Sequence, residues 1–251
     1  MTAVALETRN LNKTFGALKA TTDVSFRLAK GARHALIGPN GAGKTTFINL
    51  LTGVIRPSSG DVLLDGESVR GLNRERRVHR GLVRTFQINQ LFAGLTVVES
   101  LMLVITEREG RGWSCLRSAA KFAGTETEVA QLLKDFGLDT VFDEKCSSLP
   151  YGKQRLLEIA LAVACKPKVL LLDEPAAGVP EADRKEVMAR IAALPNEVSI
   201  LLIEHDMNLV FNFANRISVL VAGALFAEGS VEEISKDQRV KQVYLGGAEH
   251  G

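Results

Sequence analysis

The chain has 251 residues, of which 46% are hydrophobic, enough for one large domain or for a core domain with a smaller lobe. Lys and Arg number 31 against 29 for Asp and Glu, and a formal charge of only +2 argues against a general nucleic-acid-binding surface. Three scattered cysteines do not predict a disulfide framework, and no uncharged run approaches the roughly 20 residues that a membrane-spanning helix needs.

Short strands are expected in the first third of the chain. Residues 24–28 alternate apolar and polar side chains, which is the pattern of a half-buried strand. Residues 32–38 predict another strand, followed by a glycine-rich loop and a helix that ends at Gly53. The pair Asp65-Gly66 stands between two short apolar runs and therefore predicts a β-hairpin.

Helices are expected from about residue 90 to residue 165, with a loop over 107–124. Residues 128–138 place their apolar side chains on one helical face. The stretches VLLLDE (169–174) and VSILLIEHD (198–206) then begin with apolar runs typical of parallel strands that are covered on both faces. Strands first, a helical stretch, and then alternating strands and helices predict an α/β core with an inserted helical lobe.

The stretch GPNGAGKTT (38–46) fits the P-loop pattern, with Gly38, Gly43, Lys44 and Thr45 at its fixed positions. Glycines let backbone N–H groups curl around phosphate oxygens, and the helix that follows adds a partial positive charge. Lys44 is expected to contact the β- and γ-phosphates, and the Thr45 hydroxyl to bind Mg²⁺. A chain of this length matches the four positions by accident on the order of once in a hundred, so a chance glycine turn is disfavoured.

Five further side chains are candidates for the same chemistry. Asp173 closes an apolar strand and can hold Mg²⁺ through water, and Glu174 beside it can activate the attacking water, although strand-end acids often simply face solvent. His205, at the end of another apolar strand, can sense a γ-phosphate, but a lone histidine there is more often a surface residue. Gln87 can reach Mg²⁺ or water through its amide. Phe15 can stack on an adenine, although a buried aromatic is the commoner role.

In this order, Phe15, the P-loop, Gln87, LPYGKQ (149–154), VLLLDE and IEH resemble the nucleotide-binding subunit of an ABC transporter, over nearly the whole chain. The resemblance implies a P-loop ATPase core, with a mixed sheet, an antiparallel N-terminal β part and an inserted helical subdomain. It also implies that ATP and Mg²⁺ are bound and that ATP is hydrolysed.

The LPYGKQ stretch occupies the place of that family's signature loop, usually LSGGQ. The resemblance implies that this loop faces the γ-phosphate held by the P-loop of a second subunit, so that two ATP molecules lie between two chains. A helix N-terminus suits such an anion. Pro150 stands where the family has Ser and Tyr151 where it has Gly, so a hydroxyl donor is lost and Lys153 is expected to replace it in part.

The variant signature loop and two further stretches narrow the resemblance to one group within the family. The stretches YGKQRLLEIA (151–160), AAGVPEAD (176–183) and RVKQVYLGG (239–247) resemble ATPase subunits of branched-chain amino acid uptake systems and their relatives for urea, amides and aromatic acids. Pro180 stands where the family usually has Asp or Asn in a loop that crosses the dimer interface, which predicts weaker cross-talk between the two sites.

The predicted site residues fall into four groups. The predicted catalytic residues are Glu174, His205 and Gln87. The predicted Mg²⁺ ligands, partly through water, are Thr45, Gln87 and Asp173. The predicted ATP contacts are Phe15, Gly38, Pro39, Asn40, Gly41, Ala42, Gly43, Lys44, Thr45 and Thr46. The signature-loop residues expected to act on the other subunit are Leu149, Pro150, Tyr151, Gly152, Lys153 and Gln154.

The predicted organisation is a single ABC ATPase domain. Its helical subdomain is expected at about 88–165, inserted into a core of residues 1–87 and 166–235, with a tail at about 236–251. The expected partners are a second ATPase subunit, identical or different, two transmembrane permease subunits and, indirectly, an extracytoplasmic solute-binding protein, with no nucleic acid. The N-terminus becomes charged too early for a signal peptide, and the expected location is the cytoplasmic face of the cell (inner) membrane.

Two alternatives remain open at this stage. One is the ATPase of an exporter of the lipid or lipopolysaccharide type, which an LSGG-type signature would have favoured. The other is a soluble ABC protein switched by ATP, which usually carries two cassettes or a long coiled-coil insert. Neither feature occurs in these 251 residues.

Overall fold

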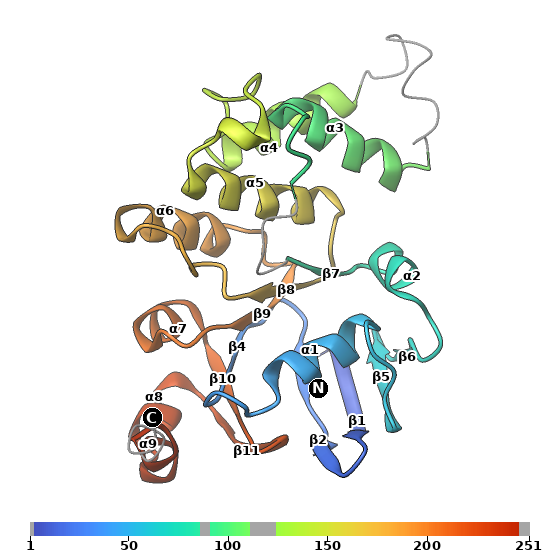
Figure 1. The fold of residues 1–251 in the computed structure, drawn as a ribbon, viewed down its shortest axis with the longest axis vertical. Helices are drawn as coiled ribbons and strands as arrows, with labels where there is room; N and C mark the ends of the chain where they lie inside the picture. The colour runs from blue at the N-terminus through green and yellow to red at the C-terminus, as the bar shows by residue number, and fades with distance from the viewer. Residues whose placement is uncertain (1–2, 86–90, 111–123, 246–251) are drawn as a thin grey trace. The chain divides into compact units, whose positions relative to one another are not determined.

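The computed structural model describes residues 3–85, 91–110 and 124–245. It divides into two compact units (Figure 1). The β-rich unit consists of Met1–Arg84, Lys168–Glu174 and Pro195–Gly251. The helical unit consists of Thr85–Pro167 and Pro175–Leu194. Most of the loop predicted over 107–124 lies outside the described residues. Of the tail predicted at about 236–251, residues 238–245 form a helix and residues 246–251 lie outside the described residues.

The described strands all belong to the β-rich unit. They are β1 (Val4–Phe15), β2 (Leu18–Val24), β3 (Arg27–Ala29), β4 (Arg33–Ile37), β5 (Ser59–Leu64), β6 (Glu67–Ser68), β7 (Leu82–Arg84), β8 (Val169–Asp173), β9 (Ser199–Ile203), β10 (Arg216–Val221) and β11 (Ala224–Gly229). The helices of this unit are α1 (Lys44–Thr52), α2 (Arg74–His79), α7 (Met207–Phe213), α8 (Val231–Lys236) and α9 (Gln238–Leu245).

The N-terminal sheet is antiparallel, with the strand order β2-β1-β5-β6 and β3 also paired with β1. The β5–β6 hairpin turns at Asp65 and Gly66, which both have positive φ, so the hairpin prediction is confirmed. The strand predicted over 24–28 is instead split between the end of β2 and the start of β3, because β1 changes partner there. Its three apolar side chains are fully buried, as the alternation predicted.

The second sheet has the order β11-β10-β4-β9-β8-β7, and four of its five strand pairings are parallel, whereas the β10–β11 pairing at one edge is antiparallel. Every residue of β8 and β9 is buried, as their continuous apolar runs predicted for strands covered on both faces. The carboxyl ends of β4, β9 and β8 therefore meet at one edge of the sheet, where parallel α/β sheets usually bind ligands.

Two apolar clusters fix this sheet in place. The larger one joins the antiparallel sheet, α1 and one face of the parallel strands, with Phe26, Phe47 and Leu171 among its fully buried members. The smaller one packs α7 and α8 against β4 and β10 on the other face, for example through Val210 and Ile217. Because α1 packs into the larger cluster and β4 packs into both clusters, the loop between them is anchored at both ends.

The helical unit contains α3 (Val97–Arg108), α4 (Thr125–Asp135), the 3-10 helix Cys146–Ser148, α5 (Tyr151–Ala164) and α6 (Glu181–Ala192). A capping box between Thr96 and Glu99 starts α3. The apolar face predicted over 128–138 is buried within this unit, from Val129 to Phe136. Arg108, at the end of α3, binds Glu128 of α4 at 2.6 Å and the Ala164 carbonyl of α5 at 2.6 Å, which ties three helices together.

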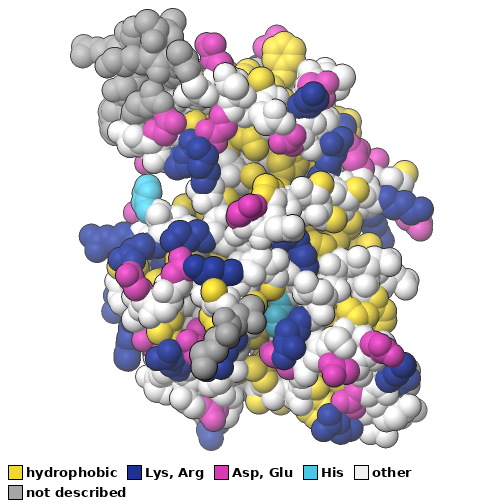
Figure 2. Space-filling view, turned by 180° about the vertical axis from the view of Figure 1, so that it is seen from behind, with side chains coloured by type: hydrophobic (Ala, Val, Ile, Leu, Met, Phe, Trp, Pro, Cys, Tyr) yellow, Lys and Arg dark blue, Asp and Glu magenta, His cyan; other side chains and the backbone are white. Residues whose placement is uncertain are grey.

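The surface shows mixed charge. Basic and acidic side chains lie interspersed over the face in Figure 2, in line with the formal charge of +2. Among the described helices there is none whose length and hydropathy would let it span a bilayer.

A buried histidine in β4 makes the stability of the β-rich unit depend on pH. His34 is fully buried, its Nε2 lies 2.8 Å from the Ser218 hydroxyl, and that hydroxyl donates to Glu228 at 2.7 Å. Because the serine proton is engaged by the carboxylate, Nε2 must donate, and Nδ1 has no hydrogen-bond partner among the described residues. Burial lowers the pKa of His34 to about 4, against the raising effect of Glu228.

The folded state therefore binds a proton less readily than the unfolded chain between pH 6.5 and pH 4. Stability should be complete above pH 6.5 and should fall by about 3 kcal/mol as the pH drops towards 4. Urea denaturation across this range tests the expectation. His34→Gln should flatten the dependence, whereas His79→Gln, at an exposed position in α2, should leave it unchanged. If the stability of His34→Gln fell with pH as steeply as that of the unmodified chain, His34 would not be the group responsible.

Candidate functional site

The loop between β4 and α1 is shaped for phosphate. A side chain at Gly38 would collide with the Leu220 carbonyl, and a Cβ at Gly43 would lie 2.6 Å from the Ala20 carbonyl, so neither position accepts another residue. Gly43 is also the N-cap of α1, with φ 96°. No side chain caps α1 and its first turn holds no acidic residue, which leaves the helix N-terminus open to an anion.

Lys44 lies at the start of α1, half-buried within this loop. Its ammonium donates to the carbonyl of Gly38 at 2.5 Å and to that of Pro39 at 3.0 Å. Burial lowers the pKa of Lys44, while the charges of Glu174 and Asp173 act in the opposite direction. The ammonium therefore sits in a desolvated position where added negative charge, such as that of a phosphate, is favourable.

Asp173 ends β8 with only 8% of its side chain exposed. Arg84, the last residue of the neighbouring strand β7, pairs with it at 2.5 Å and donates to the Asn49 side chain of α1 at 2.7 Å. This arginine lies within the sequence around Gln87, but its role was not apparent from the sequence. It links the two strands and the helix that carry the site.

Removing Arg84 should destabilise the β-rich unit. The change Arg84→Met deletes the cation facing a buried carboxylate and should cost about 3–5 kcal/mol, measured by urea denaturation. The matched control is Arg80→Met, which breaks an exposed ion pair with Glu67 and should cost about 0–1 kcal/mol. Equal denaturation midpoints for the two variants would show that the buried Arg84–Asp173 pair contributes no more to stability than the exposed Arg80–Glu67 pair.

Glu174 follows Asp173 in a strained backbone conformation. Its φ is 47°, the left-handed region, which costs a residue with a Cβ on the order of 1 kcal/mol. A hydrogen bond from its N–H to the Ile203 carbonyl at 2.9 Å holds this conformation. His205 lies beside it, with Nδ1 3.9 Å from a Glu174 oxygen and 3.8 Å from a Glu204 oxygen. The imidazole is 69% exposed and so is accessible to a ligand.

The β-rich unit thus gathers most of the predicted residues at one sheet edge. Thr45 is exposed, and its hydroxyl has no hydrogen-bond partner in the described part of the chain. Phe15, at the end of β1, is 47% exposed, with the Lys13 ammonium 4.9 Å from its ring centroid, so it is a surface aromatic and not a core residue. Gln87 lies outside the described residues.

The signature-loop candidates lie in the helical unit, at the start of α5. Pro150 is the N-cap, no side chain caps the helix, and its first turn has no acidic residue, so this N-terminus is also open to an anion. The Tyr151 hydroxyl donates to the Ala177 carbonyl at 3.2 Å. A side chain at Gly178 would lie 2.9 Å from that hydroxyl. Tyr151 therefore ties the start of α5 to the loop that precedes α6.

Two neighbours of Tyr151 face α6 directly. The Lys153 ammonium donates to the Gly137 carbonyl at 3.0 Å and to Glu186 at 3.3 Å. Gly152 is buried, and a Cβ there would lie 2.7 Å from an Asp183 carboxylate oxygen. These contacts within the chain were missed by sequence reasoning, because they join residues that lie 16 to 33 positions apart.

A glycine-rich loop opening onto a helix N-terminus, with two carboxylates ending a nearby buried strand, defines a P-loop nucleotide-binding protein. The family model described as "ABC transporter" matches residues 21–177. A solved ATP-binding cassette of an ABC transporter, in its ADP conformation, superposes with a TM-score of 0.82 at 30% identity, covering 98% of this chain and 100% of that one. The chain belongs to the ABC transporter family of ATP-binding cassettes and is an ATPase.

Named relatives cover the chain almost end to end. It is 38% identical to the high-affinity branched-chain amino acid transport ATP-binding protein BraF of Pseudomonas aeruginosa, over 99% of this chain and 100% of the relative. It is 39% identical, with the same coverage, to LivG of Escherichia coli, which has the same description. It is 33% identical to the lipopolysaccharide export system ATP-binding protein LptB of Haemophilus influenzae, over 96% and 97%. The family model "Branched-chain amino acid ATP-binding cassette transporter" matches residues 224–250.

Proposed function

We propose that this chain is the ATP-hydrolysing subunit of a membrane importer for branched-chain amino acids or a related small solute. The observation that carries the solute class is the match of residues 224–250 to the branched-chain family model, which covers β11, α8 and α9. The two relatives named for branched-chain amino acid transport support it over the full length of the chain. The structure of the ATPase core does not identify the solute, because fold alone does not determine function.

The proposed chemistry assigns one role to each residue at the sheet edge. The loop 38–46 and the N-terminus of α1 bind the phosphates through backbone N–H groups, and Lys44 adds a full positive charge at the β- and γ-phosphates. Glu174 accepts a proton from the attacking water. His205, exposed and within 4 Å of Glu174, contacts the γ-phosphate and helps to place that water. Gln87 and Phe15 keep their predicted roles, at the water or Mg²⁺ and at the adenine.

Thr45 and Asp173 fit a Mg²⁺ ion held mainly by phosphates. Mg²⁺ usually takes one or two protein oxygens and completes its shell with phosphate oxygens and water. The described residues contain no cluster of three or more His, Cys, Asp or Glu side chains that would hold a metal by themselves. The Thr45 hydroxyl, which has no partner among the described residues, and the buried Asp173 carboxylate would supply two protein ligands, partly through water, beside the predicted contact from Gln87. The ion would neutralise charge on the β- and γ-phosphates.

The proposed assembly contains two ATPase chains, identical or different, with the start of α5 of one chain facing the γ-phosphate of the other. The open N-terminus of α5 supports this, since backbone N–H groups and the helix dipole favour a phosphate there. Two permease subunits and an extracytoplasmic binding protein complete the importer, which places this chain at the cytoplasmic face of the membrane. The proposed domain organisation keeps a helical subdomain at about 88–165 and a C-terminal tail that begins at about residue 236.

An exporter is the second candidate, because one relative at 33% identity is named for lipopolysaccharide export. The importer is favoured by the higher identity of the two amino acid transport relatives and by the C-terminal match. The direction of transport separates the two candidates experimentally.

The test reconstitutes the chain with its membrane partners in vesicles that contain ATP at its own face. ATP-dependent uptake of leucine, isoleucine or valine is expected when the binding protein is added on the opposite side. Lys44→Ala should abolish uptake and lower nucleotide affinity by roughly 10- to 100-fold, because it removes a charged contact. Lys241→Ala, an exposed lysine of α9, should leave both unchanged. ATP-dependent movement of lipid without any uptake of solute would contradict the proposal.

A further inference from the structure

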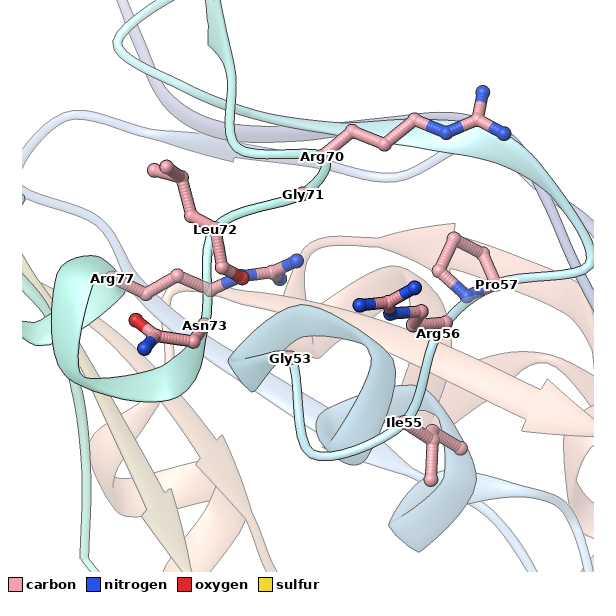
Figure 3. Close-up of a pocket in the computed structure, with 9 residues that line it drawn as sticks. All are labelled: Gly53, Ile55, Arg56, Pro57, Arg70, Gly71, Leu72, Asn73 and Arg77. Atoms are coloured by element: carbon pink, nitrogen blue, oxygen red, sulfur yellow. The ribbon is translucent and has the colours of Figure 1, made fainter.

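A basic cavity lies in the β-rich unit away from the residues assigned to ATP chemistry. Its volume is about 370 Å³, and it lies between the end of α1, the segment before β5 and the start of α2. The residues that line it are Gly53, Ile55, Arg56, Pro57, Arg70, Gly71, Leu72, Asn73 and Arg77 (Figure 3). Three arginines and no carboxylate therefore belong to the lining of one hollow.

Arg77 forms the floor of the cavity and is rigidly held. Its side chain is buried, and its guanidinium donates to the carbonyls of Leu50 at 3.0 Å and Leu51 at 2.5 Å, at the end of α1, and to that of Leu72 at 3.2 Å. Gly53 makes this possible, since a Cβ there would lie 2.7 Å from Nε. Burial lowers the pKa of Arg77, with Asp61 acting in the opposite direction. The group stays charged, because an arginine is not deprotonated in proteins.

Part of this charge is left for a ligand. The bonds to carbonyl groups use Nε and Nη1, and Nη2 has no hydrogen-bond partner among the described residues. The guanidinium of Arg56 points towards that of Arg77 across the hollow, whereas Arg70 extends away from it (Figure 3). The Arg56 guanidinium also has no partner in the described part of the chain. Both guanidinium groups therefore belong to the lining of one hollow, where an anion would be attracted by two positive charges.

We propose that this cavity binds the phosphate group of a small molecule, through Arg56 and Arg77. Two guanidinium groups match a dianion, because each offers parallel N–H donors to phosphate oxygens. The volume is that of a small-molecule site and exceeds the needs of a bare phosphate ion. Ile55, Pro57 and Leu72 add apolar walls, which suit the carbon skeleton of an organic phosphate. Such a ligand would act on α1 from the end opposite the P-loop.

The test titrates isotope-labelled protein with glycerol 3-phosphate and, separately, with inorganic phosphate, while saturating ADP fills the P-loop. The amide signals of Gly53 and Gly71 should shift and saturate, and those of Gly41 and Gly43 should stay in place. Tighter binding of the ester identifies an organic phosphate as the source, and equal binding identifies the free ion; both support a phosphate site. Shifts confined to the P-loop glycines, or no shifts, would overturn the proposal.

Matched arginine variants locate the site. Arg56→Gln should weaken binding at least about tenfold, because it removes a charge-assisted contact. Arg70→Gln removes the same charge from the rim of the cavity, but its guanidinium points away, so it should weaken binding less than about threefold. Arg77 is left unchanged, since it holds the end of α1. If the two variants weakened phosphate binding equally, the effect would come from the net charge of the surface, and the proposal of a specific site at Arg56 and Arg77 would be wrong.

Discussion

Replacing Glu174 with glutamine should lower steady-state ATP hydrolysis on the order of 100-fold or more, while ATP binding is retained. The amide keeps the size of the carboxylate but cannot accept a proton from the attacking water. The Glu174 side chain is 24% exposed. The backbone of Glu174 has a left-handed conformation, which a hydrogen bond from its own N–H group holds in place. Strain of this kind at a strand end is typical of functional positions. Phosphate release and equilibrium nucleotide binding measure the two effects separately.

Glu204 provides the matched control. It lies 3.8 Å from the same His205 nitrogen, about as close as Glu174, but it is almost completely buried. Glu204→Gln makes the same change of charge and should leave hydrolysis per folded chain within a few-fold of the unmodified rate. If Glu174→Gln hydrolyses ATP at the unmodified rate, Glu174 is not the base.

Gly152→Asp should abolish both ATP-dependent dimerisation and hydrolysis. If the start of α5 faces a γ-phosphate on a second chain, the new carboxylate opposes it at an energy of about 4 kcal/mol, roughly a thousandfold in association. Nucleotide binding by the isolated chain should persist, because its own P-loop is unchanged. The helix itself tolerates the change, since an acidic residue in the first turn is favourable there. Sedimentation with and without ATP gives the dimer fraction.

The position of Asp183 requires a second variant. A Cβ at residue 152 would crowd the Asp183 carboxylate within the same chain, so Gly152→Asp alone combines a clash in one chain with repulsion between two. The double variant Gly152→Asp with Asp183→Ala removes the carboxylate that would lie 2.7 Å from the new Cβ, so that only the Cβ of residue 183 remains close, at 3.0 Å, and it keeps the new charge at residue 152. It should remain inactive. Recovery of dimerisation and hydrolysis in the double variant would assign the defect to α6 of the same chain.

The parts of the fold that the sequence predicted correctly have local signals. The P-loop depends on glycines at fixed spacing, the stop of α1 on Gly53 with φ 75°, and the hairpin on Asp65-Gly66. The buried strands β8 and β9 follow from continuous apolar runs. β1 carries no such signal, because its 12 residues include charged and polar side chains along an irregularly paired strand.

The candidate site was predictable where one residue type implies one chemistry, and not where a contact joins distant elements. Arg84 is 89 positions from Asp173, and no local pattern distinguishes it from other arginines. Lys153 was predicted to replace a lost hydroxyl at the phosphate of a second chain; within the chain it contacts Gly137 and Glu186, so that role stays a prediction. Tyr151 occupies a position where the family usually has glycine. Its hydroxyl donates to the Ala177 carbonyl, a contact that depends on the tertiary structure and has no local signal in the sequence.

The most direct test of the account mixes Gly152→Asp chains with Lys44→Ala chains, each inactive alone. If each site uses the P-loop of one chain and the start of α5 of the other, a mixed dimer has one site with both defects and one with neither. Hydrolysis should reappear and peak at equal amounts of the two chains. In a transporter with two different ATPase subunits, the changes are placed in separate subunits. Loss of ATP binding by isolated Gly152→Asp, or mixed dimers that form but stay inactive, would contradict a site shared between chains.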